Sequence, residues 1–239
     1  MRRRTIATTT VLFVCATTAL TACSGSGSGT AAKGPAAPRT PAAANPAAAA
    51  STGPYADLTG GQILTNSLKV TRQATSLHLK ADVADPKEGA TKMDLSLDSK
   101  GDCTGTIAQG KDTIGIIKTG KTVYLRPQGT SKWTKTNTAS ADGKDLASVC
   151  DLNNFIGGFQ GEDTAAAKGA TTKVDGRPAI VLTEKDGAES FTMDVATSGK
   201  PYLLKMVTVG GDSPGILAFS HFGEPVHAVA PPRSSIAAA

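Results

Sequence analysis

The stretch that decides the fold is residues 103–127, CTGTIAQGKDTIGIIKTGKTVYLRP. It contains three short runs of alternating apolar and polar residues, separated by Gly110-Lys111-Asp112 and by Gly120. An alternation with a period of two is typical of strands that bury one face, and glycine beside polar residues is typical of tight turns. The stretch therefore predicts consecutive antiparallel strands in a sheet with one apolar face.

The same alternation continues on both sides of this stretch. Together with the central runs it predicts about eight to eleven short strands. The further strands are expected at residues 76–83 and 92–99 upstream, and at 131–137, 179–183, 190–197, 202–209 and 215–221 downstream. The expected inner-face residues are Met93, Leu95, Leu97, Ile107, Ile114, Ile116, Phe191, Met193, Val195, Leu204 and Met206.

Two segments show the spacing of a helix instead. Residues 61–74 and 143–159 carry apolar side chains three or four positions apart, as on one face of a helix. The positions are Ile63, Leu64, Leu68 and Thr71 in the first segment, and Leu146, Val149, Leu152, Phe155, Ile156 and Phe159 in the second. The predicted fold class is α+β, with two or three helices laid against one large, strongly curved antiparallel sheet.

The N-terminus has the features of an export signal. Residues 2–4 are arginines, and residues 5–22 carry no charge around an apolar centre. This is the pattern of a secretory signal peptide, and Leu20-Thr21-Ala22-Cys23 has the form of a bacterial lipobox. We expect cleavage after residue 22 and a diacylglycerol on Cys23, which would anchor the chain to a membrane. The alternative is an ordinary signal peptide with a chance cysteine.

Composition sets the other domain boundaries. Residues 24–54 consist almost wholly of Ala, Gly, Pro and Ser, a composition that cannot bury enough apolar surface to fold. Segment 23–54 is therefore predicted to be the lipidated cysteine with a disordered linker, 55–229 one folded domain, and 230–239 a flexible tail.

Charge and cysteines restrict the function further. The net charge is +5, of which three charges belong to the arginines of the export signal, and no basic stripe is interleaved with aromatics. Nucleic acid is therefore not an expected partner.

Cys103 and Cys150 are predicted to form one structural disulfide in an exported chain. No metal-binding set and no cofactor motif are found, so no metal or cofactor is expected.

No catalytic motif appears in the sequence, and the chain is predicted not to be an enzyme. His78 is expected to be a solvated histidine on the polar face of its strand, while His221 and His227 lie near the C-terminal edge without a serine or cysteine motif. An enzyme would need a nucleophile within hydrogen-bond reach of a histidine. Trp133 is expected to cap the edge of the sheet.

Several segments resemble a known family. The resemblance covers residues 57–232 and rests on the order of the lipobox, the linker, a helix leading into ATSLHLKADV, and the 103–127 stretch with SKWTK close behind it. FTMDVATSGKPYLLKMV and GILAFSHFGEPVHAVAPP complete it. The chain is similar to actinomycete lipoproteins of the LppX/LprG group, within the wider LolA/LolB-like carriers. The Cys103/Cys150 pair is a departure from the wider group.

The resemblance implies a β half-barrel wrapped over helices, enclosing an apolar cavity for a lipid or an acylated glycolipid. The chain is also expected to be a monomer, anchored through Cys23 to the outer face of the cytoplasmic membrane. The expected cavity-lining residues are Leu68, Met93, Leu95, Leu97, Ile114, Ile116, Phe155, Phe159, Phe191, Met193, Leu204 and Met206. The alternative is a tethered interaction or sensory module on the same fold, with a filled core and no lipid.

Overall fold

The computed structural model describes residues 53–85, 89–156 and 166–238. The predicted signal peptide, Cys23 and most of the linker lie outside these residues, as does Phe159, and the side chain of Phe155 is likewise not described. None of the helices in the described part has the length and apolarity needed to cross a bilayer.

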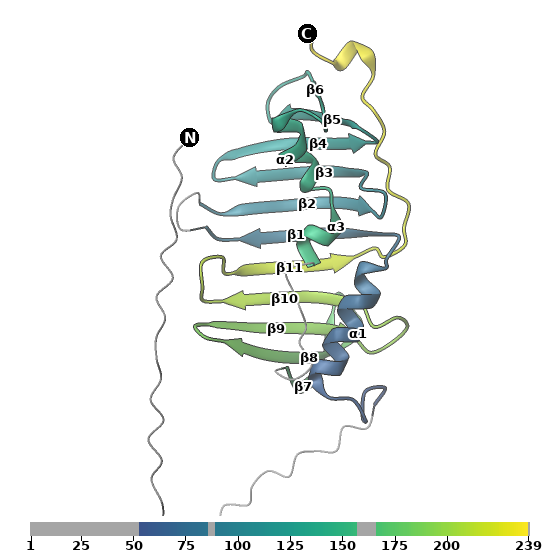
Figure 1. The fold of residues 1–239 in the computed structure, drawn as a ribbon, viewed down its shortest axis with the longest axis vertical. Helices are drawn as coiled ribbons and strands as arrows, with labels where there is room; N and C mark the ends of the chain where they lie inside the picture. The colour runs from purple at the N-terminus through teal and green to yellow at the C-terminus, as the bar shows by residue number, and fades with distance from the viewer. Residues whose placement is uncertain (1–52, 86–88, 157–165, 239) are drawn as a thin grey trace, which may run out of the picture. The chain divides into compact units, whose positions relative to one another are not determined.

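Eleven strands form one antiparallel sheet in the order β6-β5-β4-β3-β2-β1-β11-β10-β9-β8-β7 (Figure 1). Every neighbouring pair follows directly in the chain except β1 and β11, which join the N-terminal and C-terminal halves of the sheet. The bounds are β1 Ser76–Val83, β2 Thr91–Asp98, β3 Cys103–Gln109, β4 Asp112–Thr119, β5 Thr122–Pro127, β6 Thr134–Asn137, β7 Ala167–Val174, β8 Arg177–Asp186, β9 Glu189–Ala196, β10 Leu203–Val209 and β11 Gly215–Ser220. The predicted fold class, an α+β fold with a large curved antiparallel sheet, is confirmed.

One strand was not predicted. β7 is an edge strand whose residues are exposed almost throughout, so it has no buried face to impose an apolar alternation. Its hairpin to β8 turns through Asp175 and Gly176, which both have positive φ. An Asp-Gly pair in this conformation is the common two-residue turn between antiparallel strands.

The inner face of the sheet carries the main core. Leu79, Leu95 and Ile116 are fully buried there, and the intervening position in the same cross-strand row is Gly105, which lies opposite Leu95 and Ile116. A Cβ on Gly105 would lie 2.0 Å from the Asp94 carbonyl oxygen. Glycine therefore permits a close approach of backbones in the middle of the sheet.

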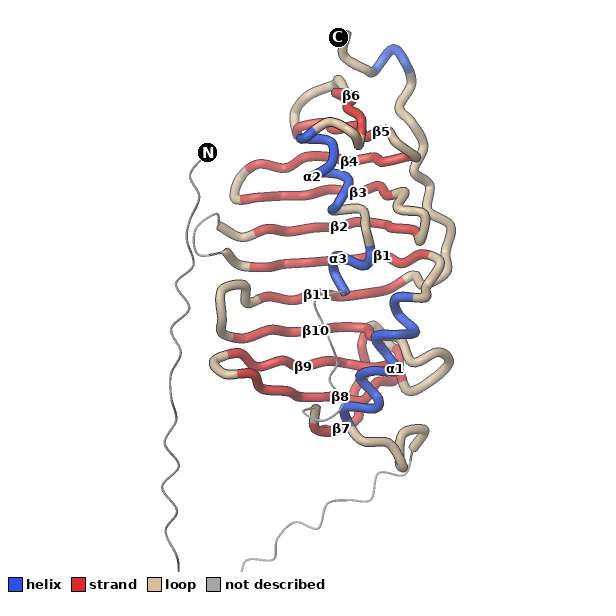
Figure 2. The backbone as a smooth tube through the Cα atoms, viewed as in Figure 1, coloured by secondary structure: helices blue, strands red, loops and turns tan. Residues whose placement is uncertain are grey.

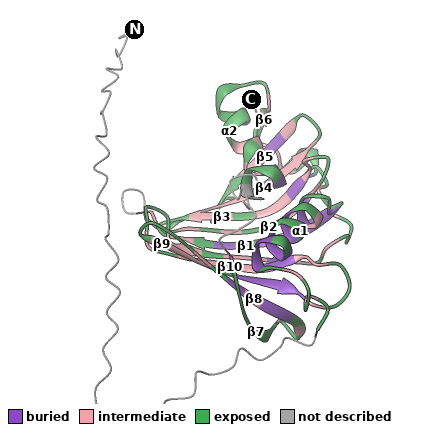
Figure 3. Cartoon of the chain, turned by 60° about the horizontal axis from the view of Figure 1, so that its bottom comes forward, coloured by how far each residue is buried: buried purple, intermediate pink, exposed green. Residues whose placement is uncertain are grey.

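Helix α1, Gly60–Arg72, packs on the inner face. It begins with a capping box, in which the Thr59 hydroxyl accepts from the Gln62 N–H and the Gln62 side chain accepts from the Thr59 N–H. Ile63, Leu64 and Leu68 enter the core, where α1 contacts β7, β9 and β10. Figure 3 shows buried residues gathered where α1 meets the sheet.

The second predicted helix is divided in two. α2 spans Ala141–Ser148 and α3 spans Leu152–Ile156 (Figure 2). Between them the Asp151 carboxylate accepts a hydrogen bond from the Asn153 N–H, and the Asn154 side chain donates to the Ser148 carbonyl. These local bonds compete with the backbone hydrogen bonds of a continuous helix, so the helix breaks here. The apolar spacing nevertheless continues across the break.

The predicted disulfide is confirmed. Cys103 at the start of β3 is bonded to Cys150, their Cα atoms are 5.5 Å apart, and both residues are fully buried. The bond attaches the α2–α3 segment to the inner face of the sheet.

The C-terminal segment differs from the predicted flexible tail. It contains a 3₁₀ turn at Arg233–Ser235. The Trp133 N–H donates to the Ser235 carbonyl, and the Ala237 N–H donates to the Trp133 carbonyl. Trp133 is buried over Gly115 with the Arg126 guanidinium 4.6 Å from its ring, so it caps this part of the sheet as expected.

Candidate functional site

A continuous apolar row crosses the inner face of nine strands. Strand register places its members opposite one another from β8 to β5. In order they are Leu182, Met193, Met206, Leu217, Ala81, Met93, Ile107, Ile114 and Pro127. We call this set the inner apolar row.

Burial changes along the inner apolar row. Leu182, Met193 and Met206 are buried in the core. Met93, Ile107 and Ile114 are only half-buried, and Pro127 is exposed. Hollows lie beside each end: one of about 500 Å³ touches Phe191, and one of about 340 Å³ touches Ile114 and Pro127. The row therefore combines a packed section with apolar side chains that are still accessible.

The structure places most of the predicted lining residues on this face. Leu68, Leu95, Leu97, Ile116, Met193 and Met206 are buried in the main core, and Met93 and Phe191 pack against it half-buried. Leu204 is different. A register shift between Leu203 and Lys205 puts Leu204 into a separate cluster with Ala179 and Ala196, away from the inner apolar row.

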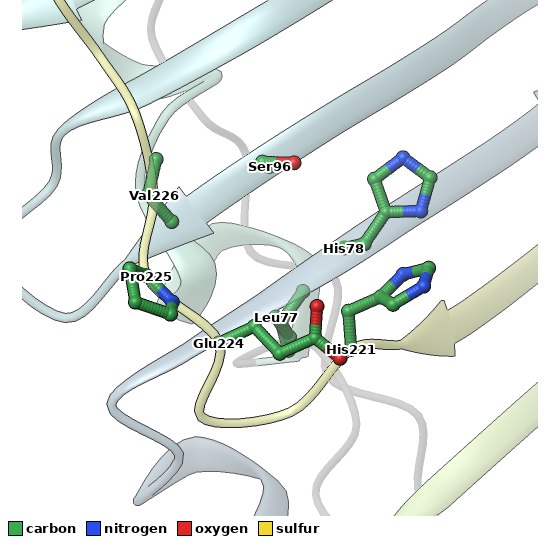
Figure 4. A pocket seen from close by; sticks show the side chains of 7 residues that line it. All are labelled: Leu77, His78, Ser96, His221, Glu224, Pro225 and Val226. Atoms are coloured by element: carbon green, nitrogen blue, oxygen red, sulfur yellow. The ribbon is translucent and has the colours of Figure 1, made fainter.

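A second site, which the sequence did not predict, lies on the outer face. A cavity of about 570 Å³ is lined by His78, Lys80, Asp175, Arg177, Tyr202, Ala218, Ser220, His221, Phe222 and Glu224. A neighbouring hollow of about 270 Å³ shares His78, His221 and Glu224 with it (Figure 4). We call the larger cavity the outer-face pocket.

Two histidines meet at one hydroxyl in the outer-face pocket. The Ser220 Oγ lies 3.4 Å from His78 Nδ1 and 3.1 Å from His221 Nδ1. His78 Nε2 lies 2.7 Å from an Asp94 carboxylate oxygen. Because a carboxylate only accepts, His78 Nε2 donates to Asp94, and in the neutral ring Nδ1 is left to accept from Ser220. The expectation that His78 is simply solvated is wrong, since its side chain is only 17% exposed.

The backbone around these histidines is held firmly. His221 has a positive φ of 50°, a conformation uncommon for residues other than glycine. The turn that follows it is bound to Ser76, whose carbonyl accepts from the Gly223 N–H and whose hydroxyl donates to the Glu224 carbonyl.

Two groups in the described residues, Asp194 and Tyr55, have a raised pKa. Burial raises the pKa of Asp194, and Lys205 on the neighbouring strand partly opposes that effect. Burial also raises the pKa of Tyr55, whose hydroxyl donates to the Ala196 carbonyl.

Within the described part of the chain, no three His, Cys, Asp or Glu side chains are grouped so that they could hold a metal ion.

The arrangement of one open antiparallel sheet with helices on its inner face is the LolA-like fold of two mycobacterial proteins. LprF from Mycobacterium bovis superposes with a TM-score of 0.52 at 16% identity, covering 72% of this chain and 96% of LprF. The lipoprotein LppX from Mycobacterium tuberculosis superposes with a TM-score of 0.50 at 16% identity, covering 71% of this chain and 97% of LppX. No protein-family model and no curated protein sequence matches the chain. The likeness defines the fold.

Proposed function

We propose that this chain is an actinomycete-type lipoprotein that binds the acyl part of a lipid or glycolipid on its inner face. Its export signal would direct it out of the cell, and the diacylglycerol on Cys23 would hold it at the outer face of the cytoplasmic membrane. The observation that carries this proposal is the inner apolar row, in which Leu217, Met93, Ile107 and Ile114 remain half-buried.

The energetics suit an acyl chain. Each methylene group removed from water contributes about 0.8 kcal/mol, so a chain lying along several half-buried side chains would be held firmly. The row presents no charged side chain from Leu182 to Ile114. An apolar ligand that binds there therefore does not have to remove a charged group of the row from water, which would be costly. Carriage of that lipid through the envelope, as a monomer, extends the same proposal.

The alternative occupant is protein. An exposed apolar row is also a surface on which another protein could dock, which would correspond to a tethered interaction module. The compact packing at Met193 and Met206 favours this alternative for that part of the row. The two readings differ in whether a lipid leaves with the purified protein.

A pair of adjacent residues on β11 provides the test. Leu217 is half-buried on the inner face, whereas Ile216 is 43% exposed and belongs to the opposite face. We would purify the exported chain carrying Cys23→Ser without detergent, so that any lipid is a passenger, and measure it by native mass spectrometry. We expect stoichiometric lipid, its loss in Leu217→Glu, and its retention in Ile216→Glu.

A lipid-free chain that stays lipid-free after incubation with envelope lipids would refute the proposal and favour the protein-docking alternative. Equal lipid loss in both variants would also count against it, because the loss would then not depend on the inner face. Circular dichroism of each variant checks that it is folded before its lipid content is compared with that of the parent chain.

We also propose that the chain is not an enzyme, although the requirement for a nucleophile near a histidine is met by Ser220. The Ser220 hydroxyl is shared between two imidazoles at the end of β11, and it is 3.4 Å from His78, the histidine that Asp94 would orient as its base. A nucleophilic serine would be labelled covalently by a fluorophosphonate. Labelling of the parent chain that disappears in Ser220→Ala would establish a hydrolase instead.

A further inference from the structure

We propose that the outer-face pocket is a second ligand site, which binds a phosphate or carboxylate group of a ligand that also carries hydroxyl or amino donors. It lies on the opposite face of the sheet from the inner apolar row. The inference is therefore independent of the lipid proposal.

Arg177 is the main anion-binding group. The Phe222 ring is stacked on Tyr202, with ring centroids 3.9 Å apart and planes 1° from parallel, and the Arg177 guanidinium carbon lies 5.7 Å from the Phe222 centroid. None of the ion pairs found among the described residues involves Arg177. A guanidinium restrained beside an aromatic ring and lacking a carboxylate partner keeps its forked donors for an oxyanion.

The histidine pair supplies directed polar atoms on the other wall. The His78 ring is committed to Asp94 and Ser220, and His221 Nδ1 is committed to Ser220. His221 Nε2 has no hydrogen-bond partner among the described residues, and Figure 4 shows the His221 ring beside the His78 ring. The Ser76-bound turn fixes the His221 backbone, so this polar atom is positioned before a ligand arrives.

The charges in the lining define the ligand further. Lys80 and Arg177 are balanced by Asp175 and Glu224, so the pocket has no large excess of positive charge. The Lys80 ammonium is 3.7 Å from Asp94, which also binds His78. A ligand that is only an anion would leave the two carboxylates of the lining without donors. A phosphate ester with free hydroxyl groups meets both requirements, because its phosphate accepts from Arg177 while its hydroxyls donate to Asp175 or Glu224.

This chemistry has two sources, a soluble phosphate ester and a lipid headgroup, and two probes separate them. sn-Glycerol 3-phosphate is the soluble probe, and vesicles of phosphatidylglycerol in phosphatidylcholine present a glycerol phosphate at a membrane surface. The protein is the exported chain carrying Cys23→Ser. Binding of the soluble probe is followed by NMR of the histidine rings, and binding of vesicles by co-flotation.

We expect saturable shifts of the His78 and His221 ring signals with a Kd on the order of 1 mM for the soluble probe. Arg177→Gln should weaken binding about tenfold by removing a charge-assisted hydrogen bond. Arg233→Gln is the matched control, because Arg233 lies in the C-terminal 3₁₀ turn and does not line the pocket. Leu217→Glu should leave this binding unchanged.

Arg177-dependent binding of the soluble ester supports a soluble ligand, and Arg177-dependent binding of vesicles alone supports a headgroup. The proposal is overturned if neither probe binds, or if Arg177→Gln and Arg233→Gln weaken binding equally. A parent chain that stays lipid-free but binds either probe in an Arg177-dependent way would reject the proposed function and leave this site standing.

Discussion

At the scale of single residues, position in the strand register decides what a polar side chain does. His78 and Ser220 are directly opposite each other on β1 and β11, and Asp94 is on the other neighbouring strand, β2. Three polar residues that are far apart in the sequence therefore converge on the outer face. Alternation with apolar residues identified His78 and Asp94 as outward-facing, but not as partners. The β1–β2 hairpin brings His78 to Asp94, and only the pairing of β1 with β11, which long-range packing decides, adds Ser220.

Asp194 allows a prediction at the same scale. It lies between Val181 and Lys205 in the sheet and is 9% exposed. Burial raises the pKa of its carboxyl above the ordinary value of an aspartate, because the charged form is poorly solvated. In the interval between the ordinary and the raised pKa the folded chain binds more protons than the unfolded chain, so this group lowers the free energy of unfolding as the pH rises.

Asp194→Asn removes that titration. We expect the melting temperature of the variant, relative to the parent, to increase as the pH is raised from about 4, the ordinary aspartate value, and then to level off above the raised pKa. The melting temperature is measured across a pH series, with Asp212→Asn, an exposed aspartate after β10, as the control. A relative stability that decreases with rising pH would show that the Lys205 attraction outweighs the burial.

At the scale of elements, apolar periodicity predicted helices and strands that bury an apolar face. It did not predict features that depend on exposed residues or on local hydrogen bonds. β1 lies at residues 76–83 as predicted, and α1 at 60–72 is close to its predicted bounds. β7 was not predicted because it is an edge strand with exposed side chains. The break between α2 and α3 was not predicted because it depends on hydrogen bonds of Asp151 and Asn154, which leave the apolar spacing intact.

The α2–α3 segment yields an element-scale prediction. None of the residues of α2 is buried except Gly143, so we expect the Cys103–Cys150 bond to hold this segment on the sheet. The bond joins residues separated by 47 positions, and closing such a loop restricts the unfolded chain by about 4 kcal/mol. Cys103→Ala with Cys150→Ala should lower the free energy of unfolding by about that amount.

Urea denaturation followed by circular dichroism measures this loss. Cys23→Ser is present in both the parent and the double variant, so that acylation does not differ between them. A dithiothreitol titration of the parent should reproduce the loss, while the double variant should not respond to the reductant. An equal response of both chains would show that the stabilisation does not come from this bond.

At the scale of the whole molecule, one sheet separates two kinds of surface. Its inner face is apolar across nine strands, and its outer face holds the polar pocket around His78 and Arg177. The fold and the inner face could be predicted from the sequence, because alternation specifies which side of each strand is buried. The pocket could not, because its residues come from β1, β11 and the turn after it, the β7–β8 hairpin and the residue before β10, and their meeting depends on the order of the complete sheet.

The proposed anchor is the feature that would place both surfaces at a membrane, and it allows the last prediction. Two cysteines precede the folded domain, Cys15 and Cys23, and only Cys23 follows a small residue in a lipobox. Cys23→Ser should move the exported chain from the membrane fraction to the soluble fraction, because a diacylglycerol supplies two acyl chains and stable attachment requires two membrane signals. Cys15→Ser, the matched control, should stay with the membranes. Fractionation with immunodetection, and the mass of the mature N-terminal peptide, provide the measurement. Retention of Cys23→Ser on membranes would refute the lipid anchor and direct attention to the outer-face pocket as a membrane-binding site.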